Sequence, residues 1–440
     1  MKISKLLSVI IACIVLLSGC SAGTVAPGPL PLPSDDGAAE ITIEVDDTAD
    51  FYGNAARRFE ELTGVKVNVI NHYSAEQTID DKDYAYLDRI PGELMAGKGA
   101  DIYTDINLDF TKIGRQGYLC NLAEWIAADP DFSDKTYYMN ILESGFDKGD
   151  VYSFPLTMTF QALETDVEIP ELDGKNLNWE ECIELIKGIN RNGVLFGLTD
   201  QQIFMRRFKE RYESFVDNEN KTQNLNTPEL IQLLEQSKTW SKQGLCIPYN
   251  EDNNASVFLN SYIKVIGGGI DMLTNSAMAN TTEATVINGE MVYSTGGNYF
   301  YDIPSDSGIS DKSNKVLESD CICVNASSPH KGTAWKFVKF LLSENIQATS
   351  YLFPINRKAA AVHIRKTFNL EFSDKSNNAD EVIKEAETLL DAINEIPNRT
   401  KTDLEKIISN EAVRYFTNEI SAEAAAKNMA DAVALYLKEQ

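Results

Sequence analysis

Alternating apolar and polar residues near the start of the folded chain predict a sheet with parallel strands. Residues 41–45 and 65–70 alternate as strands do, and residues 54–63 between them place their apolar side chains on one helical face. A strand, a helix and a second strand in this order predict a β-α-β unit, whose two strands run parallel. The first part of the chain is therefore expected to have an α/β fold.

Helical and extended patterns continue along the rest of the chain, without an internal repeat. The predicted elements are a helix over 84–96 with a potential break at Pro91, a strand over 100–106, a short helix over 110–115, an extended stretch over 150–155 that ends at Pro155, a helix over 179–189, a helix that starts at Thr227, strands over 262–266 and 317–324, a helix over 331–342, and a tail over 403–438 that is almost all helix.

The first twenty residues have the order of a secretory signal peptide. Lys2 and Lys5 precede an apolar run that is too short to span a bilayer permanently, since a span needs about 20 residues. The sequence Leu17-Ser-Gly-Cys20 resembles a bacterial lipobox. This resemblance implies cleavage before Cys20 and attachment of lipid to its thiol. The alternative is an ordinary signal peptide with an incidental cysteine.

The segment after Cys20 is predicted to be a flexible tether, over 20–39. It is rich in Gly, Ala and Pro, with proline at every second position from Pro27 to Pro33, and such segments favour extended conformations. The body that follows has roughly 400 residues, which predicts two domains.

The charge of the chain excludes some partners. The chain has 40 basic and 66 acidic residues, and loss of Lys2 and Lys5 leaves 38 basic residues, a net charge of −28. A protein with this charge is not expected to bind nucleic acid or to dock electrostatically on anionic lipid. Most of the charge is expected to form a solvated acidic surface.

The cysteines predict free thiols rather than disulfides or a metal site. Cys13 leaves with the signal peptide and Cys20 carries the lipid, so five of the seven cysteines remain in the body, an odd number. Cys321 and Cys323 are expected to point to the same face of a strand. The histidines are scattered, and no cofactor or metal is expected.

Seven stretches of the chain, in this order behind the lipobox, resemble the extracellular solute-binding proteins of bacterial ABC importers, in particular the sugar-type, family 1-like lipoproteins. They are the helix and strand over 54–67, Met95-Ala-Gly-Lys-Gly-Ala-Asp-Ile-Tyr103, residues 114–126, Gly149-Asp-Val-Tyr-Ser-Phe-Pro155, Asn178-Trp-Glu-Glu-Cys182, residues 328–340, and Phe353-Pro-Ile-Asn-Arg357.

The resemblance implies an α/β fold of two lobes joined by a hinge, the type II arrangement of periplasmic binding proteins, with the ligand in a cleft between the lobes. By this pattern, lobe 1 is expected at 40–154 plus 316–348, and lobe 2 at 155–315 plus 349–440. The implied function is capture of a small solute, a carbohydrate by preference, by hinge closure, followed by delivery to ABC permease subunits. The implied protein is a monomer anchored by lipid to the outer face of the bacterial cytoplasmic membrane, and it is not an enzyme.

The resemblance also points to four regions and one aromatic wall that would contact the solute. Sugars present apolar C–H faces and many hydroxyls, so aromatic and polar side chains suit them. Each candidate also fits a turn or core role. The candidates are Phe51 and Tyr52 after the first strand, Asp105 and Asn107, the crossing residues Phe154, Thr157 and Thr159, the Gly-rich turn with Gly268, Gly269 and Asp271, and the wall of Tyr351 and Phe353.

One feature weakens the prediction of a sugar. Many sugar-binding relatives carry a tryptophan shortly after the Gly-rich strand, whereas this chain reads Gly267-Gly-Gly-Ile-Asp-Met-Leu273 there. Two alternatives therefore stay open: a sensor lipoprotein for another solute, and an exported glycan-active hydrolase. The hydrolase is disfavoured because the chain lacks the nucleophile-elbow, zinc-protease and phosphate-loop motifs.

Overall fold

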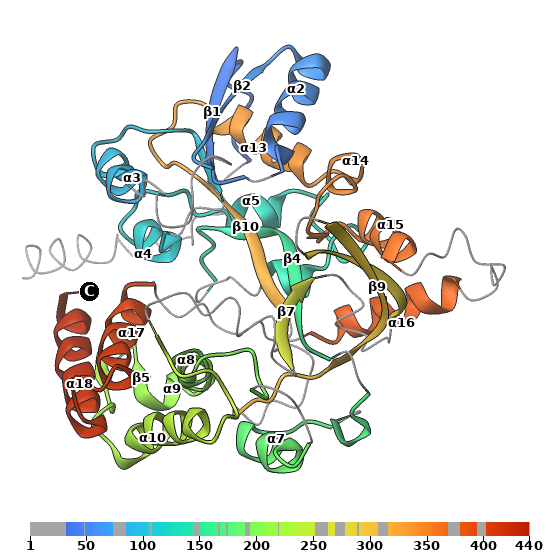
Figure 1. Ribbon diagram of the computed structural model, residues 1–440. Helices are drawn as coiled ribbons and strands as arrows, with labels where there is room; N and C mark the ends of the chain where they lie inside the picture. The colour runs from blue at the N-terminus through green and yellow to red at the C-terminus, as the bar shows by residue number, and fades with distance from the viewer. Residues whose placement is uncertain are drawn as a thin grey trace, which may run out of the picture.

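One sheet runs through the molecule and links its two halves (Figure 1). Its strands are β1 (Glu40–Val45), β2 (Lys66–Asn71), β3 (Ile102–Thr104), β4 (Phe154–Thr165), β7 (Lys264–Gly268), β8 (Met278–Ile287), β9 (Glu290–Tyr301), β10 (Val316–Val324) and β11 (Phe353–Pro354). In the part of the chain that the structure describes, seven of these follow the order β2-β1-β3-β10-β4-β9-β8, and β7 and β11 both pair with β4.

The structure is a computed structural model. It describes residues 32–47, 49–73, 85–104, 108–143, 149–165, 168–172, 175–189, 194–218, 220–250, 263–268, 278–287, 290–306, 316–367, 379–393 and 402–439. The predicted signal peptide and Cys20 lie outside these residues.

Helices cover the sheet and build most of the second half of the molecule. Their bounds are α2 (Phe51–Thr63), α3 (Ala85–Met95), α4 (Phe110–Arg115), α5 (Ala123–Ala128), α6 (Met139–Leu142), η3 (Pro170–Leu172), α7 (Trp179–Ile186), α8 (Asp200–Glu210), α9 (Tyr212–Phe215), α10 (Pro228–Lys242), α13 (Lys331–Leu341), α14 (Glu344–Gln347), α15 (Arg357–Thr367), α16 (Ala379–Asp391), α17 (Thr402–Phe416) and α18 (Ala422–Glu439). A separate small ribbon pairs β5 (Val216–Asp217) with β6 (Thr222–Gln223).

The predicted β-α-β opening is confirmed. β1 runs parallel to both β2 and β3, and the apolar residues of β1 face α2 and α13 in one buried cluster. Phe59 of α2 contacts Phe337 and Phe340 of α13, with ring centroids 5.1 and 5.2 Å apart. We call this half, with its core, the first lobe.

Three predicted boundaries differ from the structure. α2 begins at Phe51, three residues before the predicted start, so the expected loop residues form the first turn of the helix. α3 continues through Pro91, which is the seventh of its eleven residues, so the proline does not end the helix. The C-terminal tail forms two helices, α17 and α18, which pack against one another.

The strand that crosses between the halves is longer than predicted. The extended stretch does not end at Pro155, because β4 continues to Thr165. Proline is tolerated at the start of a strand, and Pro155 is the second residue of β4. The first part of β4 pairs with β10, and its last part pairs with β7 and β9. β4 therefore belongs to both halves of the molecule.

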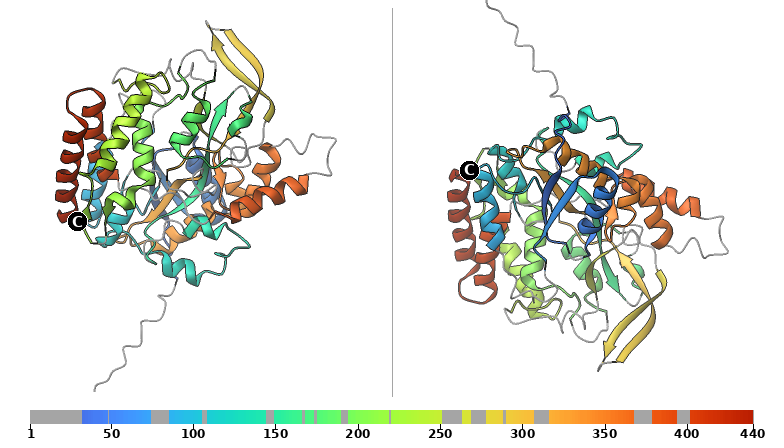
Figure 2. Two further views of the ribbon diagram at one scale, coloured as in Figure 1. Left: turned by 90° about the horizontal axis from the view of Figure 1, so that it is seen from below. Right: turned by 90° about the horizontal axis from the view of Figure 1, so that it is seen from above.

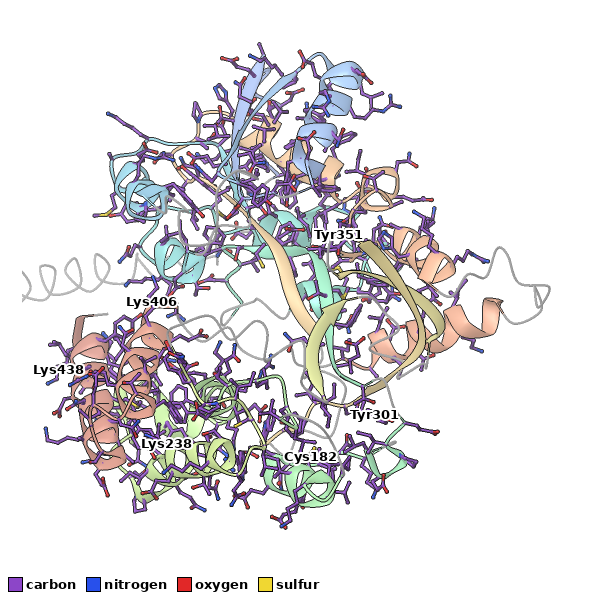
Figure 3. The ribbon with its side chains drawn as sticks, in the orientation of Figure 1. Cys182, Lys238, Tyr301, Tyr351, Lys406 and Lys438 are labelled. Atoms are coloured by element: carbon purple, nitrogen blue, oxygen red, sulfur yellow. The ribbon has the colours of Figure 1, made fainter. Side chains whose placement is uncertain are left out.

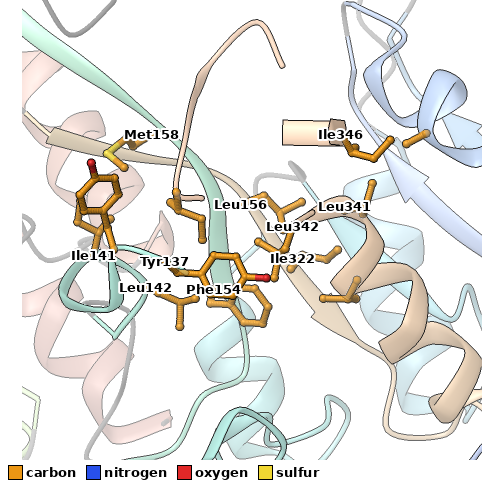
Figure 4. Close-up of a cluster of buried hydrophobic side chains, with 14 of the residues drawn as sticks. Tyr137, Ile141, Leu142, Phe154, Leu156, Met158, Ile322, Leu341, Leu342 and Ile346 are labelled. Atoms are coloured by element: carbon orange, nitrogen blue, oxygen red, sulfur yellow. The ribbon is translucent and has the colours of Figure 1, made fainter. Parts of the chain in front are cut away.

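The first lobe has a core that is rich in aromatic residues. Trp335 of α13 lies against Trp125 and Phe132, each with a ring centroid 5.4 Å away. Phe154 lies in the same cluster, close to Ile322 of β10 (Figure 4). Residues from β1 to α16 contribute to this core, so its contacts connect distant parts of the sequence.

The second lobe is built mainly from helices. α8, α10, α17 and α18 enclose a separate cluster of apolar side chains, and α7 adds another beside the end of β4. The turn from β9 brings Asp306 against α8, where Arg207 Nε donates to its Oδ2 over 2.5 Å. Both of these side chains are only 1% exposed, so a charge pair is buried inside this lobe.

The lobe boundaries stay a prediction. The packing of the described residues shows which lobe core two C-terminal segments contact. Residues of 353–367 and 379–393 pack in the core of the first lobe, whereas residues of 402–439 pack with α8 and α10. The prediction had grouped both segments with the second lobe. We use "second lobe" below for α7 to α10 with α17 and α18. Figure 2 shows that the β8–β9 hairpin projects away from both.

The cysteines within the described residues are all free and buried, as predicted for Cys120, Cys182, Cys246, Cys321 and Cys323. Burial raises the pKa of the Cys120 thiol to about 11 and that of Cys182 to about 12. None of the helices in the described part of the chain combines the length and apolar character that crossing a membrane needs.

Candidate ligand-binding site

The carboxyl ends of β1 and β3 lie at one edge of the sheet, because the two strands run parallel. The chain leaves β1 through Asp50, which has a φ of 53° before the first turn of α2. Tyr52 is buried there, and its hydroxyl lies 3.1 Å from Thr104 Oγ1 at the end of β3. The half-buried Phe51 packs edge-on against Tyr52, with ring centroids 5.1 Å apart. The predicted residues Asp105 and Asn107 lie outside the described residues.

The charged groups beside this edge are already paired with one another. Glu44 of β1 has a side chain only 2% exposed, and its Oε2 lies 2.8 Å from His72 Nε2 and 2.7 Å from Arg89 Nη2. The His72 ring also stacks on Tyr86, with centroids 4.1 Å apart. This cluster therefore serves the packing of the first lobe rather than offering a free carboxylate.

β4, which crosses between the lobes, and its partner β10 hold a second set of predicted ligand-binding residues. Thr157 of β4 is fully buried, and its hydroxyl donates to Asp320 Oδ2 of β10 over 2.7 Å. Asp320 has a φ of 50°, a backbone conformation that costs a residue with a side chain about 1 kcal/mol or more. Thr159, two residues further along β4, is half-buried. β10 also pairs with β3, where Ile322 lies opposite Thr104.

β4 also pairs with the strand of the aromatic wall at residues 157 and 158, and with the Gly-rich strand from Phe160 onward. Gly268 of β7 lies opposite Phe160, and Phe353 of β11 lies opposite Met158. Gly269 and Asp271 lie outside the described residues. The sheet thus places Thr104, Asp320, Thr157, Gly268 and Phe353 on neighbouring strands, although they are far apart in the sequence.

Three of the aromatic and crossing candidates occupy different environments. Tyr351 is 86% exposed on the surface (Figure 3). Phe353 is buried against Phe160, with ring centroids 5.3 Å apart. Phe154 is fully buried in the core of the first lobe, which favours a core role over contact with a solute.

Sequence reasoning missed one polar side chain beside β4. Arg206 of α8 is half-buried, and its Nη1 donates to Gln161 Oε1 of β4 over 3.0 Å. Burial lowers the pKa of Arg206, and it raises that of Glu210, one turn further along α8, to about 7. The sequence signal that could have predicted this helix is its start at Thr199. The side chains of Thr199 and Gln202 form a capping box there.

The two lobes also touch away from the sheet. Lys112 of α4 lies over the ring of Tyr436 of α18, with 5.4 Å from Nζ to the ring centroid. Within the described residues, no three His, Cys, Asp or Glu side chains gather in a way that could hold a metal ion.

Comparison with known proteins identifies the family. A family model described as bacterial extracellular solute-binding protein matches residues 54–369, which is well over half of the chain. The chain belongs to this family. A search of curated proteins found no match.

Solved structures show the same fold for this solute-binding protein. A solute-binding protein of an ABC transporter from Thermotoga lettingae, bound with α-D-tagatose, aligns with a TM-score of 0.56 at 17% identity and covers 91% of this chain and 100% of its own. Maltose-bound MalE3 of T. maritima aligns with a TM-score of 0.58 at 16% identity, covering 91% and 100%. The substrate-binding protein Lmo0181 of Listeria monocytogenes, in complex with cycloalternan, aligns with a TM-score of 0.57 at 15% identity, covering 91% and 99%. The predicted two-lobed α/β fold is confirmed.

We expect His363 to make this solute-binding protein sensitive to acid. Its ring packs edge-on against Phe353, and burial, together with Lys366, lowers its pKa to about 4. An unfolded histidine has a pKa of about 6.5, so the stabilisation is complete above pH 6.5 and is lost as pH falls from there to about 4. Because the ring is only partly buried, the loss is expected to be about 1 kcal/mol.

Denaturant unfolding at pH 7.5 and pH 4.5 tests this, with His363→Leu as the comparison. The free energy of unfolding of the variant should fall less than that of the unchanged protein between the two pH values. Equal losses in the two proteins would assign the acid sensitivity to other groups.

Proposed function

We propose that this solute-binding protein is an exported lipoprotein of an ABC importer, attached through lipid on Cys20. It captures a small solute between its lobes and delivers it to permease subunits in the membrane, acting as a monomer without catalysis. Carbohydrates are the favoured solutes. The observation that carries the proposal is the family match over residues 54–369, on a fold in which β4 crosses between the lobes.

The structural relatives support a carbohydrate. They are bound to tagatose, maltose and cycloalternan, which differ in size but share hydroxyl groups and apolar C–H faces. The predicted ligand residues would provide matching groups from three sides. Phe51, Asp105 and Asn107 would face the solute from the first lobe, Thr159 from the crossing strand, and Asp271 from the Gly-rich turn.

Residues beside the crossing strands would link binding to closure. The hydrogen bond between Thr157 and Asp320 joins the two strands where the chain passes between the lobes. A solute that contacts both lobes favours the closed arrangement only by its extra contacts in that state. We therefore propose that Thr157 and the buried Phe353 support the site from behind. The half-buried polar groups would contact the solute.

We expect Arg206→Ala to weaken solute binding by at least tenfold. Its guanidinium bonds to Gln161 beside the crossing strand, and a hydrogen bond to a charged group contributes about 1.5–3 kcal/mol. The probe is the sugar that raises the unfolding midpoint most in a panel of monosaccharides, linear maltooligosaccharides and cyclic glucans, and calorimetry gives its dissociation constant.

Arg58→Ala is the matched control, because Arg58 lies on α2 with a side chain 59% exposed and pairs with Glu61 one turn away. Its dissociation constant should equal that of the unchanged protein. If both variants bind the sugar equally well, Arg206 does not contact the solute.

A further inference from the structure

Residues 32–38, which the sequence assigns to a flexible tether, contact the body of the first lobe. Leu32 and Ala38 pack against its apolar core. Between them, Asp36 reaches the first turn of α13, which begins almost three hundred residues later in the sequence. The end of the tether is therefore part of the folded lobe.

Asp36 supplies the cap that α13 lacks from its own sequence. The residue before the helix, His330, makes no capping hydrogen bond with its side chain. Instead, the amides of Gly332 and Thr333 donate to Asp36 Oδ2 over 2.8 and 3.1 Å, and the Thr333 hydroxyl donates to Oδ1. The first amides of a helix otherwise lack partners, and their dipole favours a carboxylate.

Gly332 of α13 leaves room for the backbone of residues 32–38. A side chain on Gly332 would place its Cβ 1.9 Å from the carbonyl oxygen of Ser34, so a larger residue would force the segment away. Lys336 adds an ion pair with Asp35 at 2.5 Å, although both side chains are more than half exposed. A hollow of about 660 Å³ lies beside this contact, lined by Phe59, Phe340 and neighbouring residues.

We propose that residues 32–38 form a clasp that fixes the membrane tether to the first lobe at the start of α13. This inference rests on the proposed attachment of lipid at Cys20. Only the part of the tether before Leu32 then sets the distance from the membrane. The first lobe is held close to the membrane, and the second lobe is the part that moves when the solute is bound.

Hydrogen exchange of the full-length protein in detergent tests the clasp. In Asp36→Ala, we expect the amides of residues 332–334 to exchange roughly fivefold faster, the loss that an absent helix cap of about 1 kcal/mol produces. The peptide containing residues 32–38 should lose protection as well. Asp35→Ala is the matched control and should change both regions little, because an exposed ion pair contributes weakly.

A second variant separates the clasp from an ordinary effect on the helix. Alanine normally stabilises a helix relative to glycine, so Gly332→Ala would slow exchange in α13 if the segment did not dock there. The clasp predicts the opposite, because the added Cβ meets Ser34. Slower exchange in Gly332→Ala, or equal exchange in the Asp35 and Asp36 variants, would overturn the proposal.

Flotation of the same protein with liposomes of neutral phospholipid tests the membrane role separately. Flotation together with the expected exchange supports the whole proposal. Loss of flotation with the expected exchange would overturn lipid attachment and the membrane role while leaving the contact with α13 established. Unchanged exchange with flotation would overturn the clasp and leave the proposed function standing.

Discussion

Arg207→Ala is expected to lower the free energy of unfolding of the second lobe by about 3 kcal/mol, because it leaves the buried carboxylate of Asp306 with only the longer ion pair to Arg211, over 3.2 Å. Arg207 Nε donates to Asp306 Oδ2 over 2.5 Å, and both side chains are 1% exposed. The guanidinium also donates to Gln236 over 3.0 Å and lies over the ring of Trp240. Denaturant unfolding and hydrogen exchange in α8 and α10 measure the loss.

A double variant tests whether the weaker pairing of the buried Asp306 charge is the cause. Arg207→Met with Asp306→Leu removes both charges and should recover much of the stability that Arg207→Ala loses, since apolar replacements of buried ion pairs are often tolerated. Equal stability of the single and double variants would show that lost packing, rather than the buried charge, causes the effect.

Trp335→Ala is expected to destabilise the first lobe by about 3–5 kcal/mol, because it opens a large cavity among aromatic side chains. The ring is 4% exposed and lies 5.4 Å from both Trp125 and Phe132, measured between ring centroids. Its Nε1 also donates to Asp129 over 3.3 Å. Hydrogen exchange should increase in β1 and α13, while α17 and α18 keep their protection.

Leu62→Ala is a control for this prediction, because Leu62 lies on α2 with 61% of its surface exposed. Its effect should stay within about 0.5 kcal/mol. If Trp335→Ala increased exchange equally in both lobes, the two cores would unfold as one cooperative unit.

Local patterns were sufficient to predict the first lobe. The alternation over 41–45 and 65–70, with the helix between them, specifies a β-α-β unit without distant information. The odd number of cysteines in the body disfavoured a disulfide framework, and these cysteines are free and buried. Arg207 shows where such reasoning ends, since an arginine on a helix is usually exposed and nothing nearby indicates that Asp306 will cover it.

The candidate site was harder to predict because strand pairing assembles it. Thr157 and Asp320 are separated by 163 residues and meet only through the register of β4 with β10. The helix with Arg206 was missed because its apolar positions are few. The contact of residues 32–38 with the first lobe was not predicted either, because Asp36 finds its partners on α13, almost three hundred residues later in the sequence.

We propose above that this family member binds a small solute, with carbohydrates favoured. Thermal unfolding of residues 21–440 against a panel of sugars, oligosaccharides, peptides and polyamines tests it most directly. A ligand at a hundred times its dissociation constant adds about 2.7 kcal/mol to the folded state. We expect a raised midpoint with one class of carbohydrate and no product formed. A shift only with peptides or polyamines would contradict the carbohydrate assignment, and no shift with any solute, together with consumption of a glycan, would contradict the binding function.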